Sequence, residues 1–322
     1  MKAIVVDGPG GPEALRLEEM EIPAHGRGEL LVRVAACGLN PVDLKIRQGY
    51  FSQGRSYPAI LGYDVCGQVE AAGMGASFAP GDEVYYHADL TKQGAYAEYH
   101  VVDSSIVDYK PENLTQVEAA SLPLSGVTAI QALFEKARLE PMEKVLIAGA
   151  AGGVGSLAVQ MASWRGAQVI GVCSGPNMDY VRRLGAEYVV DYTSANVAGE
   201  VARITGGEGV HVAFDLVGGE SFAVCVDCLG RDGRLVFLNA FSNWEKRLME
   251  TMNKARPRNL AIFCELVRNS GKDMKMLSFL ARKGFVKPQV KQVIELGQVA
   301  EAHNRLETMR GRGKIVIDMS RS

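Results

Sequence analysis

The chain has 322 residues, more than one average domain, so its length predicts two domains that each bury a core of their own. Apolar residues make up 47% of the sequence, charged residues make up 22%, and the formal net charge is −2, which is the composition of an ordinary globular protein. The near balance of charge excludes a general attraction to nucleic acid, and it indicates a small molecule as the partner.

Three features of the sequence bear on its location. Residues 1–7 reach a carboxylate after an apolar run of four residues, shorter than the roughly 7–15 of a signal-peptide core, so we expect no secretion. Residues 145–164 are uncharged and have the roughly 20 residues that span a membrane, but their glycines, serines and Gln160 argue against a span. The six cysteines are scattered rather than clustered, which favours a reducing cytoplasm.

The part of the chain before residue 110 has the pattern of β structure. Short runs rich in β-branched and aromatic residues alternate with glycines at residues 30–35, 66–72, 83–87 and 95–102. Such runs, with frequent turns between them, predict an irregular, mostly antiparallel β domain.

From residue 144 the pattern changes to apolar strands that alternate with helix-length segments. Strands are expected at residues 145–148, 168–173, 188–191, 210–217 and 234–239, and helices at 156–165 and 177–184. Near-continuous apolar runs are typical of parallel strands that are covered on both faces. They predict a doubly wound α/β domain.

The alternation of strand and helix ends after Leu266. Residues 287–296, 299–309 and 314–319 then have the patterns of a strand, a helix and a strand. We expect these last elements to return to the first domain.

A glycine-rich turn, residues 149–155 (GAAGGVG), directly follows the strand expected at residues 145–148 and precedes a helix-forming segment. This order forms the phosphate site of dinucleotide-binding domains, because glycine allows a tight turn and lets the backbone approach a pyrophosphate. Free amide groups and the positive end of the helix dipole then face the anion. A nicotinamide dinucleotide is therefore expected at Gly149, Ala151, Gly152, Gly153, Val154 and Gly155. The alternative is a tight connection that binds nothing.

The residues after the second expected strand bear on the choice between NADH and NADPH. An NAD-preferring site offers an acidic residue to the ribose 2′-hydroxyl roughly 20 residues beyond the glycine turn. No such residue occurs between Arg165 and Asp179. Ser174 and Asn177 instead give a polar, uncharged helix start, where a 2′-phosphate can accept hydrogen bonds without meeting a nearby carboxylate. This favours NADPH over NADH.

Four motifs together resemble the medium-chain dehydrogenase/reductase superfamily: NPVDLKIRQG at residues 40–49, GDEV at 81–84, GAYAEY at 94–99 and the glycine turn. The nearest branch is the zinc-independent quinone oxidoreductases, and the resemblance runs almost end to end. It implies an α/β architecture with two domains and an active site in the cleft between them. A GroES-like, β-rich catalytic domain would comprise residues 1–123 and 267–322, and a Rossmann NADP-binding domain residues 124–266.

The resemblance also bears on metal use. Zinc-dependent members have a cysteine where this chain has Asn40, and a histidine followed by an acid where it has Tyr63 and Asp64. The closely spaced cysteines of the family's structural zinc loop are missing too. A tetrahedral zinc site needs four suitable ligands, so we expect no metal. The pair Cys225 and Cys228 has no second pair and precedes an expected helix end, which favours buried structural thiols.

Hydride transfer needs few catalytic side chains, because the cofactor carries the chemistry and the protein mainly positions the reactants. Without a metal, hydrogen-bond donors must stabilise the negative charge that develops on the substrate oxygen. By resemblance, the candidate catalytic residues are Asn40, Lys45, Tyr50 and Tyr63. The alternative for Asn40, and the favoured interpretation of Asp43, is a hydrogen bond to the loop backbone that fixes the shape of the loop. The alternative for the two tyrosines is a place in the wall of the cleft, and Lys45 stands where related reductases often have tyrosine.

The resemblance implies further contacts with the cofactor. Thr128 would lie near the nicotinamide or the phosphates, and Tyr192 near the 2′-phosphate. The remaining candidates, at strand ends and near the C-terminus, are Val217, Gly218, Leu238, Asn239, Arg312 and Lys314.

These inferences predict an NADPH-dependent oxidoreductase that delivers hydride to a quinone or an electron-poor enone without zinc. The alternatives are a zinc-dependent alcohol dehydrogenase and a non-enzymatic, cofactor-binding regulatory protein, because a fold does not fix a function. We expect neither nucleic acid nor membrane as a partner. The apolar residues 260–264 resemble the family's dimer-forming edge strand, which predicts a homodimer, and an internal strand is the alternative.

Overall fold

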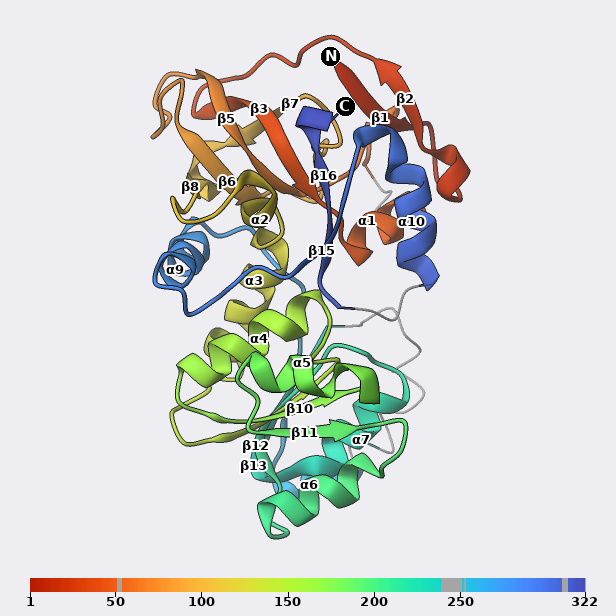
Figure 1. The fold of residues 1–322 in the computed structure, drawn as a ribbon, viewed down its shortest axis with the longest axis vertical. Coiled ribbons are helices and arrows are strands. Elements are labelled where there is room, and N and C mark those ends of the chain that lie inside the picture. The colour runs from red at the N-terminus through yellow and green to blue at the C-terminus, as the bar shows by residue number, and fades with distance from the viewer. Residues whose placement is uncertain (51–53, 239–250, 252, 309–311, 322) are drawn as a thin grey trace. The chain divides into compact units, whose positions relative to one another are not determined.

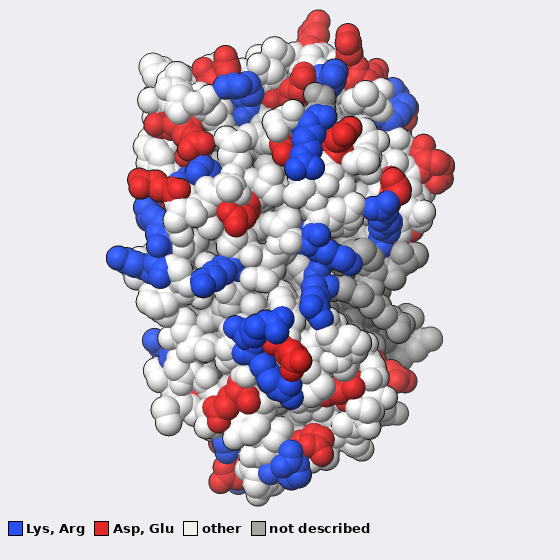
Figure 2. Space-filling view, in the orientation of Figure 1, with Lys and Arg blue, Asp and Glu red and all other residues white. Residues whose placement is uncertain are grey.

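The computed structural model describes residues 1–50, 54–238, 251, 253–308 and 312–321. The chain divides into two compact units (Figure 1). Unit 1 comprises Met1–Val127 and Asn269–Ser322, and unit 2 comprises Thr128–Arg268. Within the described ranges, no helix is both long enough and apolar enough to cross a membrane. On the face shown in Figure 2, acidic and basic side chains are interspersed, in keeping with the small net charge.

Unit 1 is built mainly from antiparallel strands. They are β1 (Lys2–Val6), β2 (Arg16–Glu19), β3 (Glu29–Gly38), β4 (Ala59–Ile60), β5 (Asp64–Ala72), β6 (Glu83–His87), β7 (Tyr99–Asp103), β8 (Asp108–Tyr109), β15 (Val290–Ile294) and β16 (Lys314–Asp318). A seven-stranded sheet has the order β15-β16-β3-β5-β6-β8, with β7 also paired to β3, and a three-stranded sheet has the order β2-β1-β4. The expected antiparallel β domain is therefore present.

The C-terminal segment belongs to unit 1. Strand β16 pairs antiparallel with β3, so that Val316 lies beside Gly38, and β15 pairs with β16 in parallel. Side chains from β3 and β16, such as Val32 and Ile317, are buried in one core. The return of the last elements to the first domain is confirmed.

Helices fill the remaining segments of unit 1. They are α1 (Pro41–Arg47), α2 (Gln116–Ala120), α9 (Gly271–Arg282) and α10 (Val299–Thr308), with short 3₁₀ turns η1 (Pro12–Ala14), η2 (Ser104–Ile106), η6 (Leu296–Gln298) and η7 (Met319–Arg321). Helix α3 (Pro123–Ile130) carries the chain from unit 1 into unit 2.

Unit 2 is a doubly wound α/β domain, as predicted. Its strands are β9 (Lys144–Ala148), β10 (Gln168–Cys173), β11 (Tyr188–Asp191), β12 (Val210–Asp215), β13 (Leu229–Phe237) and β14 (Ala261–Cys264). All pair in parallel, in the order β11-β10-β9-β12-β13-β14. Successive residues Val145, Leu146 and Ile147 of the central strand are all fully buried, because helices cover both faces of the sheet.

The helices of unit 2 lie on the two faces of this sheet. They are α4 (Gly153–Trp164), α5 (Met178–Arg183), α6 (Val197–Thr205) and α7 (Glu220–Cys228), with η3 (Gln131–Lys136), η4 (Gly175–Asn177) and η5 (Arg256–Arg258) as short turns. Figure 1 shows α4 and α5 on one face and α6 and α7 on the other. Cys225 and Cys228 are buried in the last turns of α7, and burial raises the pKa of both thiols, as expected of structural cysteines.

Strands β12 and β13 of unit 2 differ from their predicted limits. Strand β13 comprises Leu229–Phe237, whereas a strand was predicted at residues 234–239, of which Asn239 lies outside the described residues. Strand β12 ends at Asp215, two residues early, because the Asp215 carboxylate accepts hydrogen bonds from the backbone N–H groups of Val217 and Gly218 and bends the chain there. Strand β14 is last in the sheet order and pairs with β13. It is therefore an edge strand of the described sheet, and the alternative of an internal strand is wrong.

Candidate functional site

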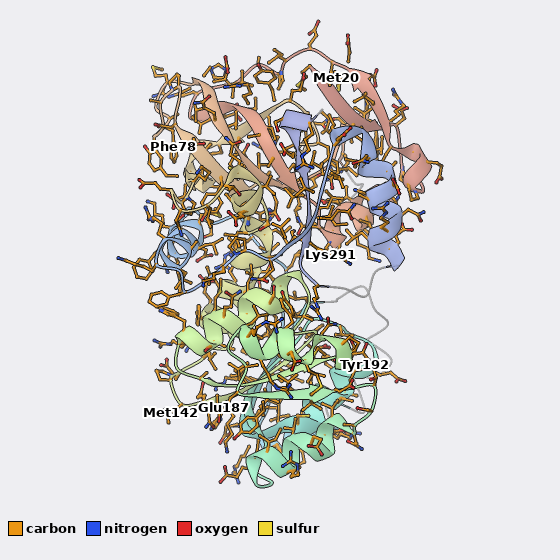
Figure 3. All side chains as sticks on the ribbon, viewed as in Figure 1. Met20, Phe78, Met142, Glu187, Tyr192 and Lys291 are labelled. Carbon is orange, nitrogen blue, oxygen red and sulfur yellow. The ribbon has the colours of Figure 1, made fainter. Side chains whose placement is uncertain are left out.

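The predicted cofactor residues of unit 2 gather at one edge of its sheet. Because the strands are parallel, their carboxyl ends meet at the same edge, where open α/β sheets bind ligands. The candidates that follow these ends are Gly149 after β9, Ser174 after β10, Tyr192 after β11, Val217 and Gly218 after β12, and Leu238 after β13. Tyr192 is 50% exposed and is labelled in Figure 3. The predicted contact Asn239 lies outside the described residues.

The glycine turn after β9 has the geometry of a phosphate cradle. Gly149 has φ +79°, a conformation that glycine adopts easily. Gly152 caps α4 with extended backbone, and no described side chain caps this helix. The first backbone N–H groups of α4 are therefore suited to an anion, which the helix dipole also favours.

Gly152 and Gly155 are glycines for different reasons. A Cβ atom on Gly155 would lie 2.2 Å from the carbonyl oxygen of Gly149, so this position needs glycine for packing alone. A Cβ atom on Gly152 would lie 3.4 Å from that oxygen, and no other atom of the described residues would lie within 4 Å of it. The protein itself therefore has room for a side chain at Gly152, and its absence leaves the approach to the turn open. This arrangement fits a pyrophosphate.

The other predicted residues of the turn and Thr128 have more ordinary places. Ala151 is buried, Gly153 is the first residue of α4 and Val154 is half-buried. Thr128 is buried within α3.

The turn after β10 holds the residues predicted to contact the 2′-phosphate. Asn177 donates from Nδ2 to Oγ of Ser174 at 3.0 Å, so the two side chains form a single polar unit. The backbone N–H of Tyr192 donates to the carbonyl oxygen of Cys173 at 3.2 Å, which ties the end of β11 to the same turn.

Asp191 places a carboxylate beside this turn, which corrects the expectation that no carboxylate lies nearby. Its Oδ1 accepts hydrogen bonds from the backbone and the hydroxyl of Thr193, and these bonds lower the pKa of Asp191. Its Oδ2 would lie 2.8 Å from a Cβ atom on Gly175. The prediction missed Asp191 because it considered only the residues after β10, whereas the parallel pairing sets Asp191 beside Cys173.

Asp215 is a second residue that sequence reasoning missed at this edge. It is fully buried, and its Oδ1 accepts the hydroxyl of Ser221 at 2.8 Å as well as the N–H of Val217 at 3.0 Å. It thereby fixes the turn that carries Val217 and Gly218. The sequence pattern of a carboxylate at the end of an apolar strand, followed by glycines, could have predicted this role of Asp215.

In unit 1, Asn40 and Asp43 build the start of α1. The backbone N–H of Asn40 donates to Oδ2 of Asp43 at 2.7 Å, and the hydroxyl of Tyr96 donates to the same oxygen at 2.8 Å. Asp43 is fully buried, and burial raises its pKa to about 7 against these hydrogen bonds, which lower it. Asp43 therefore shapes the loop at the start of α1.

The side chain of Asn40 is held by two charged groups. Its Nδ2 donates to Oδ2 of Asp64 at 2.9 Å and to the carbonyl oxygen of Gly38 at 3.5 Å, and its Oδ1 accepts from Nζ of Lys314. Lys314 also donates to Oδ2 of Asp64 at 2.9 Å. Both N–H directions of the Asn40 amide therefore point into the protein. The ammonium of Lys314, predicted to contact the cofactor, is likewise engaged in this buried network.

Lys45 and Tyr50 are the predicted catalytic residues that reach the surface of unit 1. Tyr50 is 41% exposed, Lys45 is half-buried, and Nζ of Lys45 lies 5.1 Å from the centre of the Tyr50 ring. This distance is within the range of a cation–π contact. Arg312 is exposed.

Tyr63 has a different environment from that of Lys45 and Tyr50. It is fully buried, its hydroxyl accepts from Nη1 of Arg55 at 3.0 Å, and burial raises its pKa. A side chain that is fully buried does not contribute to the solvent-accessible wall of a cleft. This geometry favours packing as the role of Tyr63.

The residues at the positions of the superfamily's catalytic zinc do not fit a metal ion. Asn40 and Asp64 offer oxygen atoms, but the ammonium of Lys314 already donates hydrogen bonds to both of them. Zinc sites in proteins are built from thiolate, imidazole and carboxylate ligands, and a cation at this point would face the positive charge of Lys314.

Comparison with known proteins defines the class of this chain. Residues 26–112 match the family described as alcohol dehydrogenase GroES-like domain, and residues 184–317 match the family described as zinc-binding dehydrogenase. The chain is 32% identical to NAD(P)H oxidoreductase RTN4IP1, mitochondrial, of Danio rerio, over 99% of this chain and 91% of that protein. It is 31% identical to the quinone oxidoreductase of Rattus norvegicus, over 98% and 97% of the two chains.

Solved structures agree with this assignment. An NAD-dependent alcohol dehydrogenase has a TM-score of 0.93 and 32% identity, over 99% of this chain and 100% of that chain. The quinone oxidoreductase of Escherichia coli complexed with NADPH has a TM-score of 0.89 and 26% identity, with the same coverage. The fold and these relatives define a nicotinamide-dependent oxidoreductase. The chain belongs to the medium-chain dehydrogenase/reductase superfamily, in its quinone oxidoreductase branch.

Proposed function

We propose that this protein is an NADPH-dependent reductase that delivers hydride to a quinone or an electron-poor enone without zinc. The observation that carries the proposal is the carboxyl edge of the unit 2 sheet, where an uncapped helix and the open glycine Gly152 form a cradle for a pyrophosphate. The names of the relatives, a quinone oxidoreductase with NADPH among them, support the reaction. The substrate is thus a small molecule.

Lys45 and Tyr50 are the proposed donors to the substrate oxygen. The cofactor supplies the hydride, and as it reaches the conjugated acceptor, negative charge develops on the acceptor oxygen. An ammonium and a phenol at the surface of unit 1 are suited to stabilise that charge by hydrogen bonds. Asn40 is assigned a positioning role instead, because both of its amide N–H directions are turned into the protein.

The proposal of zinc-free chemistry is supported by Lys314. Its ammonium hydrogen-bonds Asn40, which stands where zinc-dependent members have a cysteine, and Asp64, which follows the Tyr63 that replaces their histidine. A divalent cation there would have to displace a buried positive charge, which the electrostatics of a low-dielectric site oppose.

The preference for NADPH is supported by the polar turn after β10. Ser174, Asn177 and the half-exposed Tyr192 offer hydrogen-bond donors for a 2′-phosphate. The nearby carboxylate of Asp191 accepts hydrogen bonds from the Thr193 and Ser194 hydroxyls, which weakens its repulsion of a phosphate without removing it. We therefore expect a moderate preference for NADPH over NADH.

A homodimer in the cytoplasm completes the proposal. Strand β14 lies at the edge of the described sheet and is only partly buried, so that a second copy can pair with it. None of the six cysteines, all of which lie in the described ranges, forms a disulfide, as is usual in a reducing compartment. Size-exclusion chromatography with light scattering tests the dimer, and a monomer at micromolar concentration would contradict it.

The function is tested by following the oxidation of NADPH and NADH with a quinone panel and an enone panel, with and without a chelator. We expect turnover that is faster with NADPH and unaffected by the chelator. Lys45→Met should lower kcat by about tenfold, and the exposed control Lys275→Met on α9 should not. Tight binding of NADPH without turnover of any acceptor, or alcohol oxidation that the chelator abolishes, would overturn the proposal.

A further inference from the structure

A buried ion pair joins three segments of unit 1 that are distant in the sequence. Lys314 is the first residue of β16, Asp64 the first residue of β5, and Asn40 the cap of α1. The Lys314 side chain is 7% exposed and the Asp64 side chain is not exposed at all. The pair is therefore shielded from solvent, unlike ion pairs at the surface, which contribute little to stability.

Asp64 is the centre of this network, because its two oxygen atoms hold two different helices. Oδ2 accepts the side-chain amide of Asn40 at 2.9 Å and so holds the start of α1. Oδ1 accepts the backbone N–H of Leu124 at 2.5 Å and so holds the first turn of α3. A movement of this carboxylate would disturb both helices.

Lys314 supplies the positive charge that the buried carboxylate of Asp64 requires. A buried charge without a partner is strongly destabilising, so Asp64 keeps its position only while a cation is bound to it. His87 is its neighbour across the sheet, but burial lowers the pKa of His87, and this side chain brings no second positive charge at neutral pH. The balance of charge at Asp64 therefore rests on Lys314.

Lys314 also fixes the direction of the Asn40 amide. The ammonium donates to Oδ1 of Asn40, while Nδ2 of Asn40 donates to Asp64. A reversed amide would set a donor against the ammonium and an acceptor against the carboxylate. Asn40 therefore has one arrangement, and α1, which carries Lys45, begins from a fixed point.

We propose that Lys314 is a positioning residue of the reduction: through Asp64 and Asn40 it holds α1 and the first turn of α3 in their working positions. This inference rests on the proposed function, in which Lys45 of α1 donates to the substrate oxygen. In this role Lys314 touches neither the acceptor nor the cofactor, and it acts only through Asp64 and Asn40.

Kinetics of Lys314 variants test the proposal. Lys314→Met should lower kcat for a quinone by about 10- to 100-fold with less than a twofold change in the KM for NADPH, because misplaced groups slow the chemical step. Lys314→Arg, which keeps the charge, should recover part of kcat. The matched control is Lys110→Met, since the Lys110 side chain is 8% exposed and donates to the carbonyl oxygen of Leu114 at 2.9 Å. It should keep both constants within twofold.

A charge-balanced variant keeps the test valid if Lys314→Met does not fold. Lys314→Met combined with Asp64→Asn leaves no unpaired buried charge, so it should fold, yet it should show the same loss of kcat. Hydrogen exchange followed by mass spectrometry should show faster exchange in both α1 and residues 121–127 of this variant, and no change in Lys110→Met. Hydrogen exchange needs no turnover, so it tests whether Lys314 holds α1 and the first turn of α3 even if the wild-type protein reduces no acceptor. A lack of turnover in the wild-type protein would contradict only the proposed function. Wild-type kcat in the Lys314 variants, or faster exchange confined to β16, would overturn the proposal.

Discussion

The carboxyl edge of the unit 2 sheet and the Asn40–Asp64–Lys314 network of unit 1 are built in opposite ways. At the sheet edge, the groups suited to an anion are backbone N–H groups of one short turn, residues 149–155, and side chains matter mainly by their absence. In the network, the groups are three side chains, and Asp64 is separated from its partners by 24 and 250 positions. Substitutions at the sheet edge should therefore act by adding atoms where space is limited, and substitutions in the network should act by removing a charge.

The largest effect is expected at Gly155. Gly155→Ala would place Cβ 2.2 Å from the carbonyl oxygen of Gly149 and 2.9 Å from Cα of Ala150, and both are backbone atoms that cannot turn aside. We expect the free energy of unfolding to fall by about 3 kcal/mol in urea titrations. Gly199→Ala, in α6, is the control, because its Cβ would meet nothing closer than 3.6 Å, and it should raise stability by up to about 1 kcal/mol. Equal stability of the two variants would refute a packing role for Gly155.

A second prediction concerns Asp43 and pH. Burial raises its pKa to about 7 from 3.8, so the folded protein binds more protons than the unfolded chain between these values. Wild-type stability should therefore fall as pH rises through this window, whereas Asp43→Asn, which cannot titrate, should lose less. We expect a difference of about 2 kcal/mol between the two proteins to develop from pH 5 to pH 7 in urea titrations. Parallel curves across this range would show that Asp43 is not a protonated, buried carboxyl group.

Gly152 separates binding from folding at the sheet edge. Gly152→Ala adds a methyl group that the protein accommodates at 3.4 Å from its nearest atom, with φ −76°. Stability should stay within about 1 kcal/mol of wild type, while the Kd for NADPH rises by at least about tenfold, because the methyl group stands in the approach to the helix N-terminus. Isothermal titration calorimetry measures this change. Unaltered affinity would place the pyrophosphate elsewhere.

The smallest effect is expected at Asp191. Asp191→Asn removes a carboxylate beside the turn of Ser174 and Asn177, while its side-chain oxygen can still accept from Thr193. The Kd for NADPH should fall by about threefold and that for NADH should change little, since only NADPH carries a 2′-phosphate that the carboxylate repels. The effect should shrink at high salt. A similar change for both nucleotides would exclude Asp191 from the choice of cofactor.

The structures of the two regions could also be predicted from the sequence to different extents. The strand, turn and helix around Gly149 are local, so the alternation of strands and helices from residue 144 onward predicted the fold, and the three glycines of the turn suggested a phosphate site. The carboxylate of Asp191 was not predicted near Ser174, because the two residues are brought together by strand pairing, which a local sequence pattern does not show. Strand β12 was predicted two residues too long, because the Asp215 side chain bends the chain where the apolar run continues.

The network of unit 1 could be anticipated only in part. Resemblance selected Asn40 and Lys314, but for different roles, since nothing in a linear pattern shows that β16 pairs with β3 and brings Lys314 to Asp64. Burial of the Asn40 amide and of Tyr63 likewise depends on residues from distant strands. Local sequence patterns therefore do not predict a buried ion pair such as Lys314–Asp64, whose partners are distant in the sequence.

The fate of the hydride decides whether this account of the enzyme is right. NADPH carrying deuterium at both C4 positions is incubated with the protein and an electron-poor enone, and the reduced product is analysed by mass spectrometry. We predict that one deuterium appears on carbon in the product and that its formation is slower than with unlabelled NADPH, because the hydride moves directly from cofactor to acceptor. A reduced product without deuterium, or no product while NADPH is bound, would contradict the account.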